Sequence, residues 1–352
     1  MSILPVVYSE TFRPGDFRRI VTDSDNRQLN LWTGPTIRPS GTSRTTRDAL
    51  LFIEFLQRLF PVEEERLYFR DWLAHAVRYP DRRINATVLL RSAHGVGKGF
   101  LAETLLPGLL GKASVGTVSL GDVVGTFNDA LVGKTVVMID EVYKNPASTV
   151  NALKSIQGNQ TITLRRKHIP DTTVDNYLNF IMTSNDQTPL PIEREDRRFW
   201  IPSFIEHRFS KDETMLFINT QLKPWLINDG GMQTVRDLLE AVDLSAFRPW
   251  GDPPMTASKS AMIGTSSADE LGQFVENYIA NFPVVKARDI EESYCTQTGR
   301  SLGNRAVPAV LKKLGCISKR TSNFRGWITP SGQSAGLSES SAPTDLRQAY
   351  AK

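Results

Sequence analysis

One segment combines small residues with a single lysine in a way that could bind phosphate: Ser92-Ala93-His94-Gly95-Val96-Gly97-Lys98-Gly99. Small residues let successive backbone N–H groups turn toward an anion, and a helix that follows adds its positive end. Lys98 could then reach the β- and γ-phosphates of a nucleotide. Ser92 replaces the usual first glycine, and Gly99 replaces the Ser or Thr that binds Mg²⁺, so the metal would need water and Asp140 instead. A plain flexible turn is the alternative.

Two acids end an apolar run further along the chain, in Val136-Val137-Met138-Ile139-Asp140-Glu141. Carboxylates at the end of a buried strand are costly unless they bind a metal or hydrogen-bond donors. We expect Asp140 to hold Mg²⁺ through its hydration shell and Glu141 to activate the attacking water. A solvated acidic turn is the alternative. Together with Lys98, the pair predicts hydrolysis of a nucleoside triphosphate.

Two later segments add polar groups that could complete such a site. The first is Ile181-Met182-Thr183-Ser184-Asn185, in which Asn185 could hydrogen-bond the γ-phosphate or its water. The second is Glu195-Asp196-Arg197-Arg198-Phe199-Trp200, in which an arginine could reach the nucleotide of a neighbouring subunit. A turn at Asn185 is one alternative. Pairing of Arg197 and Arg198 with nearby acids is the other, and those acids are Glu193, Glu195 and Asp196.

Strands and helices in alternation must position these groups. Apolar runs predict buried strands over residues 86–90, 135–139 and 179–182, covered on both faces as in a parallel sheet between helices. Each run ends in polar residues, which is where open α/β sheets place their chemistry. Two helices are expected earlier, over residues 47–60 and 62–79, each followed by a proline. They could form a helical collar or simply belong to the core.

The composition is that of an ordinary soluble protein, with 40% apolar and 23% charged residues among 352. A net charge of +4 is small, so nucleic-acid binding has to rest on local basic clusters. The two cysteines, Cys295 and Cys316, have no metal-ligand spacing and exclude a disulfide framework. Neither a signal peptide nor a membrane span is visible, so we expect a cytoplasmic location.

The order of these pieces resembles the superfamily 3 helicases, the AAA+-type motors of small DNA viruses, phages and mobile elements. The resemblance rests on the compact spacing from the glycine-rich loop to the acid pair and Asn185, and on two sequence segments. These are Thr126-Phe127-Asn128 with Leu131-Val132-Gly133-Lys134, and Asp196-Arg197-Arg198-Phe199. The chain looks most like phage helicase modules that lie behind primase-polymerase domains, where a glycine also follows the P-loop lysine, as Gly99 does here. The resemblance covers about residues 30–330.

The resemblance implies an ATP- and Mg²⁺-dependent replicative DNA helicase of a phage or mobile element, working as a hexameric ring on single-stranded DNA. In such a ring one subunit would supply four side chains to each nucleotide: Lys98, Asp140, Glu141 and Asn185. The next subunit would supply Arg197, with Arg198 as the alternative. Expected partners are single-stranded and forked DNA, further copies of the chain and a separate primase or polymerase, in bacterial or phage-infected host cytosol and without a membrane.

A basic segment between the acids and Asn185 is expected to contact DNA. In superfamily 3 helicases this interval is a β-hairpin that projects into the ring channel, and its tip in the papillomavirus replicative helicase resembles Arg166-Lys167-His168. A Lys–His pair on a mobile tip could hold one phosphate and stack on a sugar. The predicted DNA-binding residues are Arg165, Arg166, Lys167 and His168. A solvated basic loop is the alternative.

The predicted fold is an α/β P-loop NTPase of the AAA+-like type, with a parallel central sheet, an N-terminal helical collar and a C-terminal winged-helix domain. The predicted divisions are residues 1–82 with the collar, 83–250 as the ATPase core, 251–267 as a linker, 268–330 as the winged helix and 331–352 as a disordered tail. The winged helix could bind DNA, dock on a protein or cover the motor.

Two other functions remain open. One is an AAA+ ATPase that loads or remodels replication proteins at an origin. The other is a small-molecule kinase, which would need an acceptor pocket and would have no use for a trans arginine or a basic hairpin.

Overall fold

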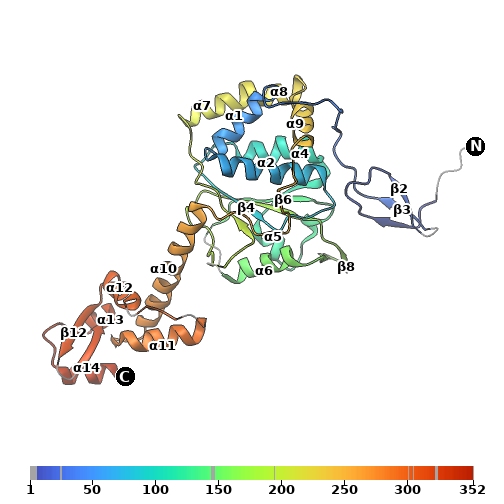
Figure 1. Cartoon of the computed structure of the whole chain (residues 1–352). Coiled ribbons are helices and arrows are strands. Elements are labelled where there is room, and N and C mark those ends of the chain that lie inside the picture. Colours follow the sequence, from blue (N-terminus) through green and yellow to red (C-terminus); the bar gives the residue numbers. More distant parts are fainter. Residues whose placement is uncertain are drawn as a thin grey trace, which may run out of the picture. The chain divides into compact units, whose positions relative to one another are not determined.

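The computed structural model describes residues 6–23, 26–143, 147–193, 195–299, 301–303, 305–321 and 324–351 (Figure 1). The chain divides into two compact units, unit 1 with Met1–Ile263 and unit 2 with Gly264–Lys352. Among the described residues, no helix combines the length and the apolar character that crossing a membrane requires.

A five-stranded parallel sheet lies at the centre of unit 1. In spatial order its strands are β10 (Phe199–Trp200), β4 (Thr87–Arg91), β9 (Asn179–Ser184), β6 (Val136–Ile139) and β5 (Val115–Val118). Every neighbouring pair is parallel. The carboxyl ends of all five strands therefore lie at one edge, where the segments that follow β4, β9 and β6 meet. The three predicted strands are present, and β5 and β10 extend the sheet at its two sides.

Both faces of the sheet are covered, which explains why its central strands are apolar throughout. Side chains alternate along β4, so that Val88 and Leu90 join one hydrophobic cluster while Leu89 joins the other. Helices of the first cluster are α1 (Leu50–Leu59), α2 (Glu63–Arg78), α4 (Leu106–Leu110) and α9 (Gly231–Glu240). Helices of the second are α5 (Leu120–Val124) and α6 (Ala147–Gly158) (Figure 1).

The two helices predicted ahead of the sheet are therefore core helices within the single chain. Their buried faces include Phe55 of α1 and Trp72 of α2, and both belong to the same cluster as β4. The indole N–H of Trp72 donates to the carbonyl of Ala86 at 3.1 Å, just before β4 begins. A collar would be a property of an assembled ring, and that part of the prediction stays a prediction.

Two long helices of unit 1 each contain a π-helical turn that ends two residues before a proline. The first consists of α3 (Lys98–Phe100), η1 (Leu101–Leu105) and α4, and the second of α7 (Lys211–Leu216), η4 (Phe217–Leu222) and α8 (Lys223–Asn228). Pro107 and Pro224 have no N–H to donate to the preceding turn, which favours a local change of helical register.

Smaller elements complete unit 1. Near the N-terminus, a three-stranded sheet has the order β1 (Ser9–Thr11), β3 (Asn26–Asn30) and β2 (Ile20–Asp23). Two short 3₁₀ turns are η2 (Lys112–Ser114) and η3 (Asp129–Leu131). A separate antiparallel hairpin is formed by β7 (Thr161–Arg166) and β8 (Ile169–Asp175).

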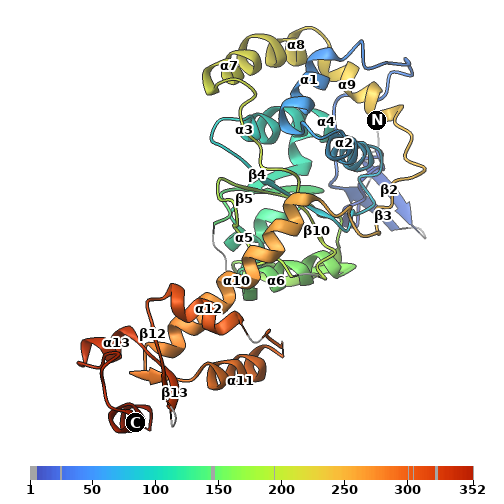
Figure 2. The same cartoon turned by 60° about the vertical axis from the view of Figure 1, so that its left-hand side comes forward.

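Unit 2 is built on a small sheet with the order β11 (Val284–Val285), β13 (Phe324–Ile328) and β12 (Ile317–Thr321). Its helices are the C-terminal part of α10 (Ala257–Ile279), α11 (Ala287–Thr298), α12 (Ala306–Lys313), α13 (Pro330–Ser334) and α14 (Pro343–Tyr350). Strands β12 and β13 form an antiparallel pair (Figure 2). Helix α14 packs against β11 and β13. Helices α11 and α12 come before the antiparallel pair of β12 and β13 in the chain, and the winged-helix interpretation stays a prediction.

The predicted linker and tail need correction. Helix α10 begins at Ala257, inside the segment predicted as a linker over residues 251–267. The tail predicted to be disordered contains α14, in which Leu346 is fully buried. The hydroxyl of Tyr350 donates to the carboxylate of Asp289 at 2.5 Å. Leu346 and Tyr350 lie one helical turn apart, so both contacts come from one face of α14 in a segment of otherwise polar composition.

Candidate active site

The glycine-rich loop between β4 and α3 needs glycine for both conformation and space. Gly95 and Gly97 have φ angles of 86° and 113°, which side-chain-bearing residues rarely adopt. A Cβ atom on Gly97 would lie 2.9 Å from the ring of Phe55 and 3.0 Å from Ile218. Val96 between them is buried in the core and anchors the loop. The loop therefore presents its backbone outward at the start of a helix, as phosphate binding requires.

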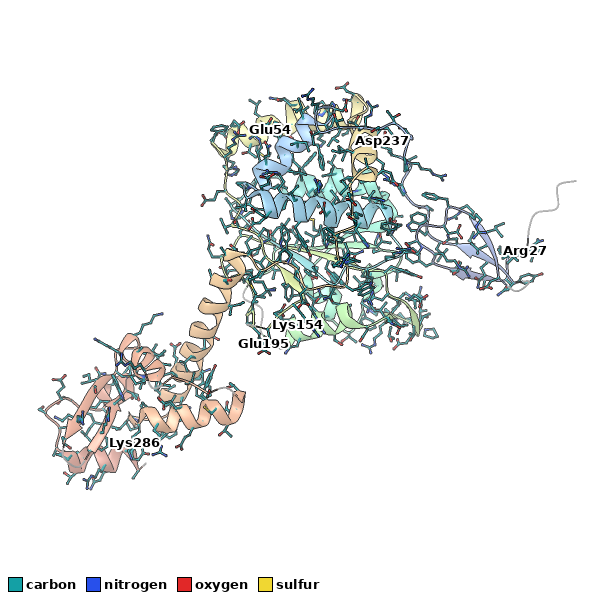
Figure 3. All side chains as sticks on the ribbon, viewed as in Figure 1. Arg27, Glu54, Lys154, Glu195, Asp237 and Lys286 are labelled. Carbon is teal, nitrogen blue, oxygen red and sulfur yellow. The ribbon has the colours of Figure 1, made fainter. Side chains whose placement is uncertain are left out.

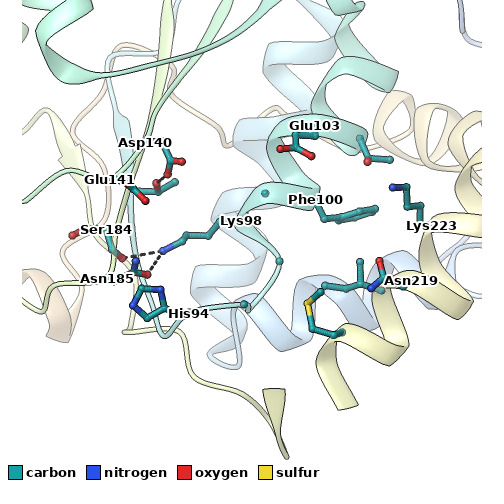
Figure 4. A pocket seen from close by; sticks show the side chains of 17 residues that line it. His94, Lys98, Phe100, Glu103, Asp140, Glu141, Ser184, Asn185, Asn219 and Lys223 are labelled. Atoms are coloured by element: carbon teal, nitrogen blue, oxygen red, sulfur yellow. Dashed lines mark hydrogen bonds between the residues drawn. The ribbon is translucent and has the colours of Figure 1, made fainter. Parts of the chain in front are cut away.

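One cavity of about 370 Å³ gathers most of the predicted nucleotide-binding residues (Figure 4). The predicted residues that line it are His94, Gly95, Gly97, Lys98, Gly99, Asp140, Glu141 and Asn185. They come from the segments that follow β4, β6 and β9, at the carboxyl edge of the sheet. Three segments that lie far apart in the sequence thus meet in one cavity, and of the predicted loop residues Val96 alone turns its side chain into the core.

Lys98 lies at the centre of this cavity and already has polar partners. Its Nζ donates to the side-chain oxygen of Asn185 at 2.6 Å and to the carbonyl of Ser184 at 3.2 Å (Figure 4). These contacts follow from strand order, because β9 lies between β4 and β6. Burial lowers the pKa of the Lys98 ammonium, and the nearby carboxylates of Asp140 and Glu141 oppose that shift. An anion entering the cavity would favour the charged form further.

The two acids are held at the end of β6 in different ways. The hydroxyl of Thr183 on β9 donates to the carboxylate of Asp140. Glu141 has a φ of 53°, the left-handed conformation that costs a side-chain-bearing residue about 1–2 kcal/mol. The next residue, Val142, again pairs with the neighbouring strand β9, because its backbone N–H donates to the carbonyl of Thr183 at 2.8 Å. Strain of this kind is concentrated at functional sites, where the surrounding structure holds it in place.

The other side of the cavity comes from residues that carry no recognisable motif. Phe100 follows the glycine loop, and Met215, Ile218, Asn219 and Lys223 come from the helix formed by α7, η4 and α8. Figure 4 shows Phe100, Asn219 and Lys223 across the glycine loop from Asp140 and Glu141. Sequence reasoning missed these residues because helix periodicity predicts a buried face and does not say which site that face borders.

A histidine connects this helix to the glycine loop. The Nε2 atom of His207 lies 3.0 Å from the carbonyl of His94, and its Nδ1 lies 2.9 Å from the hydroxyl of Thr214. The aliphatic part of Lys211 also lies over Gly95, since a Cβ there would come within 3.1 Å of it. The loop is thereby braced on the side that faces α7.

The two predicted arginines lie outside this cavity and differ from each other. The Arg198 guanidinium donates to the carbonyl of Lys154, so it is held within its own chain. Arg197 is exposed and, within the described part of the chain, forms no ion pair or hydrogen bond through its side chain. The alternative, in which these arginines pair with nearby acids, is wrong for Asp196, whose carboxylate instead pairs with Lys154 at 2.5 Å.

The predicted DNA-binding residues form the end of the hairpin of β7 and β8. Lys167 and His168 are the two residues between the strands, both exposed, and His168 has a φ of 63°. Arg165 is paired with Asp171 across the hairpin at 3.5 Å, while Arg166 is half-buried. The tip therefore presents a lysine and a histidine to solvent, away from the residues that line the cavity.

Asn128 holds this hairpin from the side. Its amide nitrogen donates to the carbonyl of Thr163 at 3.0 Å, and its amide oxygen accepts the backbone N–H of Arg165 at 2.8 Å. Its own backbone N–H donates to the carbonyl of Arg165 at 3.1 Å. Asn128 thus pairs with β7 much as a neighbouring strand would. Within the segment Thr126-Phe127-Asn128, the asparagine therefore supports the hairpin through its hydrogen bonds.

Comparisons with known proteins agree with this architecture. Residues 90–198 match the model of a family of unknown function, DUF5906. A DNA primase-polymerase of Nitratiruptor phage NrS-1 is 30% identical over 135 residues, which are 37% of this chain and 18% of that protein. The chain thus matches less than a fifth of the length of this curated relative.

Solved structures extend the likeness beyond the matched sequence. An apo structure of the NrS-1 C-terminal region in its A form has a TM-score of 0.58 and 18% identity, covering 91% of this chain and 84% of that one. A second apo structure of that region has the same TM-score and coverage at 17% identity. The chain is therefore similar in part of its sequence to a phage DNA primase-polymerase, and in its α/β fold to the C-terminal region of NrS-1.

Proposed function

We propose that this chain is an ATP-driven DNA helicase of the superfamily 3 type, from a phage or mobile element, that works as a hexameric ring. One observation carries the proposal: a single cavity that contains the glycine loop, Lys98, both acids and Asn185. A cation, a candidate base and an amide facing one space are what hydrolysis of a nucleoside triphosphate requires. The likeness to a phage primase-polymerase supports a role in replication beside a priming enzyme.

In this proposal each residue has a role that follows from its position in the cavity. Backbone N–H groups of residues 95–99 and the Lys98 ammonium bind the phosphates, so Lys98 exchanges its contact with Asn185 for a phosphate oxygen. Asn185 is then available to orient a water. Glu141, strained at the strand end, takes a proton from that water as it attacks.

The residues present also fit Mg²⁺ brought in with the nucleotide. Mg²⁺ keeps several waters and usually takes only one or two carboxylates beside the phosphates. Asp140, supported by Thr183, supplies one carboxylate, and a Cβ on Gly99 would meet no atom within 4 Å, so the space beside the loop is open. When bound, the ion would neutralise charge that develops on the phosphates.

The nucleobase would lie on the side of Phe100 and Asn219. Phe100 offers an aromatic surface, and the Asn219 amide can donate to and accept from a base edge. We expect Asn219→Ala to weaken nucleotide binding up to about tenfold, the scale of one hydrogen bond, and to reduce discrimination between ATP and GTP. Titration with fluorescent nucleotides measures both effects.

The matched control for this variant is Asn228→Ala, which removes an exposed asparagine at the end of α8. If Asn219→Ala left both the nucleotide affinity and the base preference unchanged, the base would have to bind in another part of the cavity.

The hairpin is the observation that favours a helicase over an ATPase that remodels or loads proteins at an origin. Both functions need the same nucleotide site, but only the helicase needs an exposed lysine and histidine on a projecting turn to follow the DNA backbone. A winged helix in unit 2 would suit either function. The deciding test is ATP-dependent unwinding of forked DNA by the purified protein.

Replacing both tip residues, Lys167→Ala with His168→Ala, is expected to abolish unwinding and the part of ATP hydrolysis that DNA stimulates. The physical reason is loss of the one contact that couples the hairpin to a phosphate, while the nucleotide cavity is lined by other residues. Forked-DNA unwinding and ATP hydrolysis with and without single-stranded DNA measure the two losses.

Lys112→Ala removes an exposed lysine elsewhere in unit 1 and should change neither activity. Full unwinding by the tip variant would favour the remodelling ATPase or another path for the DNA.

A further inference from the structure

The turn that carries Arg197 is held from inside by a buried carboxylate. Asp196 accepts the backbone N–H of Arg198 at 2.9 Å and that of Phe199 at 3.1 Å. Its side chain is 2% exposed and forms an ion pair with Lys154 of α6 at 2.5 Å. Figure 3 labels Lys154 and also Glu195, the residue before Asp196. The path of the backbone through Arg197 is therefore set by hydrogen bonds to one side chain.

A second lysine, which follows the turn in the sequence whereas Lys154 precedes it, also holds this turn. Lys259, in the first turn of α10, is 1% exposed. Its Nζ donates to the carbonyl of Asp196 at 2.6 Å and to the carbonyl of Phe199 at 2.8 Å. These two carbonyls bracket Arg197 and Arg198, so one ammonium holds both ends of the turn.

The placement of Lys259 is itself supported. Its backbone N–H donates to the hydroxyl of Thr256 at 3.0 Å, and that hydroxyl donates to the carbonyl of Ile201, just after β10. Burial lowers the pKa of Lys259, and the carboxylate of Asp196 opposes the shift. A lysine buried this completely is costly, and an apolar side chain would fill the space at lower cost. Its two backbone contacts are what an apolar residue could not supply.

We propose that Lys259 is a positioning residue for Arg197, which it holds in the orientation needed to reach the nucleotide of the adjoining subunit. This inference rests on the proposed function, in which Arg197 acts across a subunit interface. Arg198 is tied to Lys154, and the turn is held at both ends, so the Arg197 side chain is the part left to extend outward. A catalytic cation acts best when it needs no reorganisation at the moment of reaction.

The test is Lys259→Met, which keeps the length of the side chain and removes the ammonium. ATP turnover of the assembled protein is expected to fall by about 10- to 100-fold, the effect of misplacing a catalytic group on the order of 1 Å. Nucleotide affinity should stay within about twofold of the parent, because the residues that line the cavity are unchanged. Lys112→Met is the control for removing a lysine from the surface.

Mixing separates positioning from general damage to the fold. A Lys259→Met subunit retains its own cavity, and a Lys98→Ala subunit retains a correctly held Arg197. In an equal mixture about one interface in four combines the cavity of a Lys259→Met subunit with the Arg197 of a Lys98→Ala subunit. Up to about a quarter of the parent turnover should therefore return. Simple misfolding would give no such recovery.

A second variant reaches the same turn without altering α10. Asp196→Asn keeps the shape of the side chain but removes the charge that pairs with Lys154, and it should show the same loss and the same recovery. Full turnover in Lys259→Met would overturn the proposal. The proposal would also be overturned if turnover recovered in the mixture with Arg197→Ala but in neither mixture with Lys259→Met or Asp196→Asn. In that case Arg197 would still act across the subunit interface. Absence of recovery for Arg197→Ala as well would instead remove the trans arginine itself.

Discussion

Replacing Glu141 by glutamine is expected to lower ATP turnover by about a hundredfold to ten-thousandfold, the range attributed to a positioned general base. Glutamine has nearly the same shape but cannot take a proton from the attacking water. Lys98, the glycine loop and Asp140 remain in place, so nucleotide binding should be largely retained. Phosphate release at saturating ATP measures the first effect, and titration with a fluorescent nucleotide measures the second.

The matched control for this variant is Glu103→Gln, because Glu103 is another carboxylate that lines the same cavity. It lies on η1 rather than at a strand end, and its backbone is not strained, so its loss should have a far smaller effect. Normal turnover in Glu141→Gln would remove the assignment of the base. A large loss in Glu103→Gln alone would transfer the role to Glu103.

Arg197→Ala is expected to lower turnover by about a thousandfold or more, as is typical of an arginine supplied to the γ-phosphate from a second subunit. In the proposed site the guanidinium would stabilise charge that develops in the transition state, so kcat should fall much more than nucleotide affinity. Its exposure within the single chain is consistent with a partner supplied by assembly. Steady-state hydrolysis by the assembled protein measures the effect.

Arg198→Ala is the comparison that identifies the residue. Arg198 is tied to the carbonyl of Lys154 within its own chain, so its loss should disturb the turn and reduce activity less than loss of Arg197. A larger defect in Arg198→Ala would make Arg198 the residue that reaches the neighbouring nucleotide.

Mixed assemblies test whether Arg197 acts in trans. An Arg197→Ala subunit retains Lys98, and a Lys98→Ala subunit retains Arg197, so either alone should be inactive. In an equal mixture about one interface in four joins the two intact halves, and a corresponding share of turnover should return. No recovery at any mixing ratio would mean that Arg197 does not serve a neighbouring subunit.

Local sequence was sufficient to predict the parts of the site that depend on local chemistry. Gly95 and Gly97 stand where the backbone has a positive φ, and the apolar runs of β4, β6 and β9 reflect burial on both faces. Because parallel strands end at one edge, acids and an amide placed after such runs had to come together with the loop.

The sequence by itself therefore determined the glycine loop, the strands that flank it and the polar groups at their ends, since each depends on a few neighbouring residues. Only the tertiary structure decided the rest. Asn219 joins the cavity from a distant helix, Asn128 braces the hairpin, and Lys259 holds the turn of Arg197 across about 60 residues of chain. Leu346 likewise orders a polar tail by filling a small apolar cluster. Such contacts arise from the packing of elements far apart in the chain, and no local pattern of residue types records which distant group a side chain will meet.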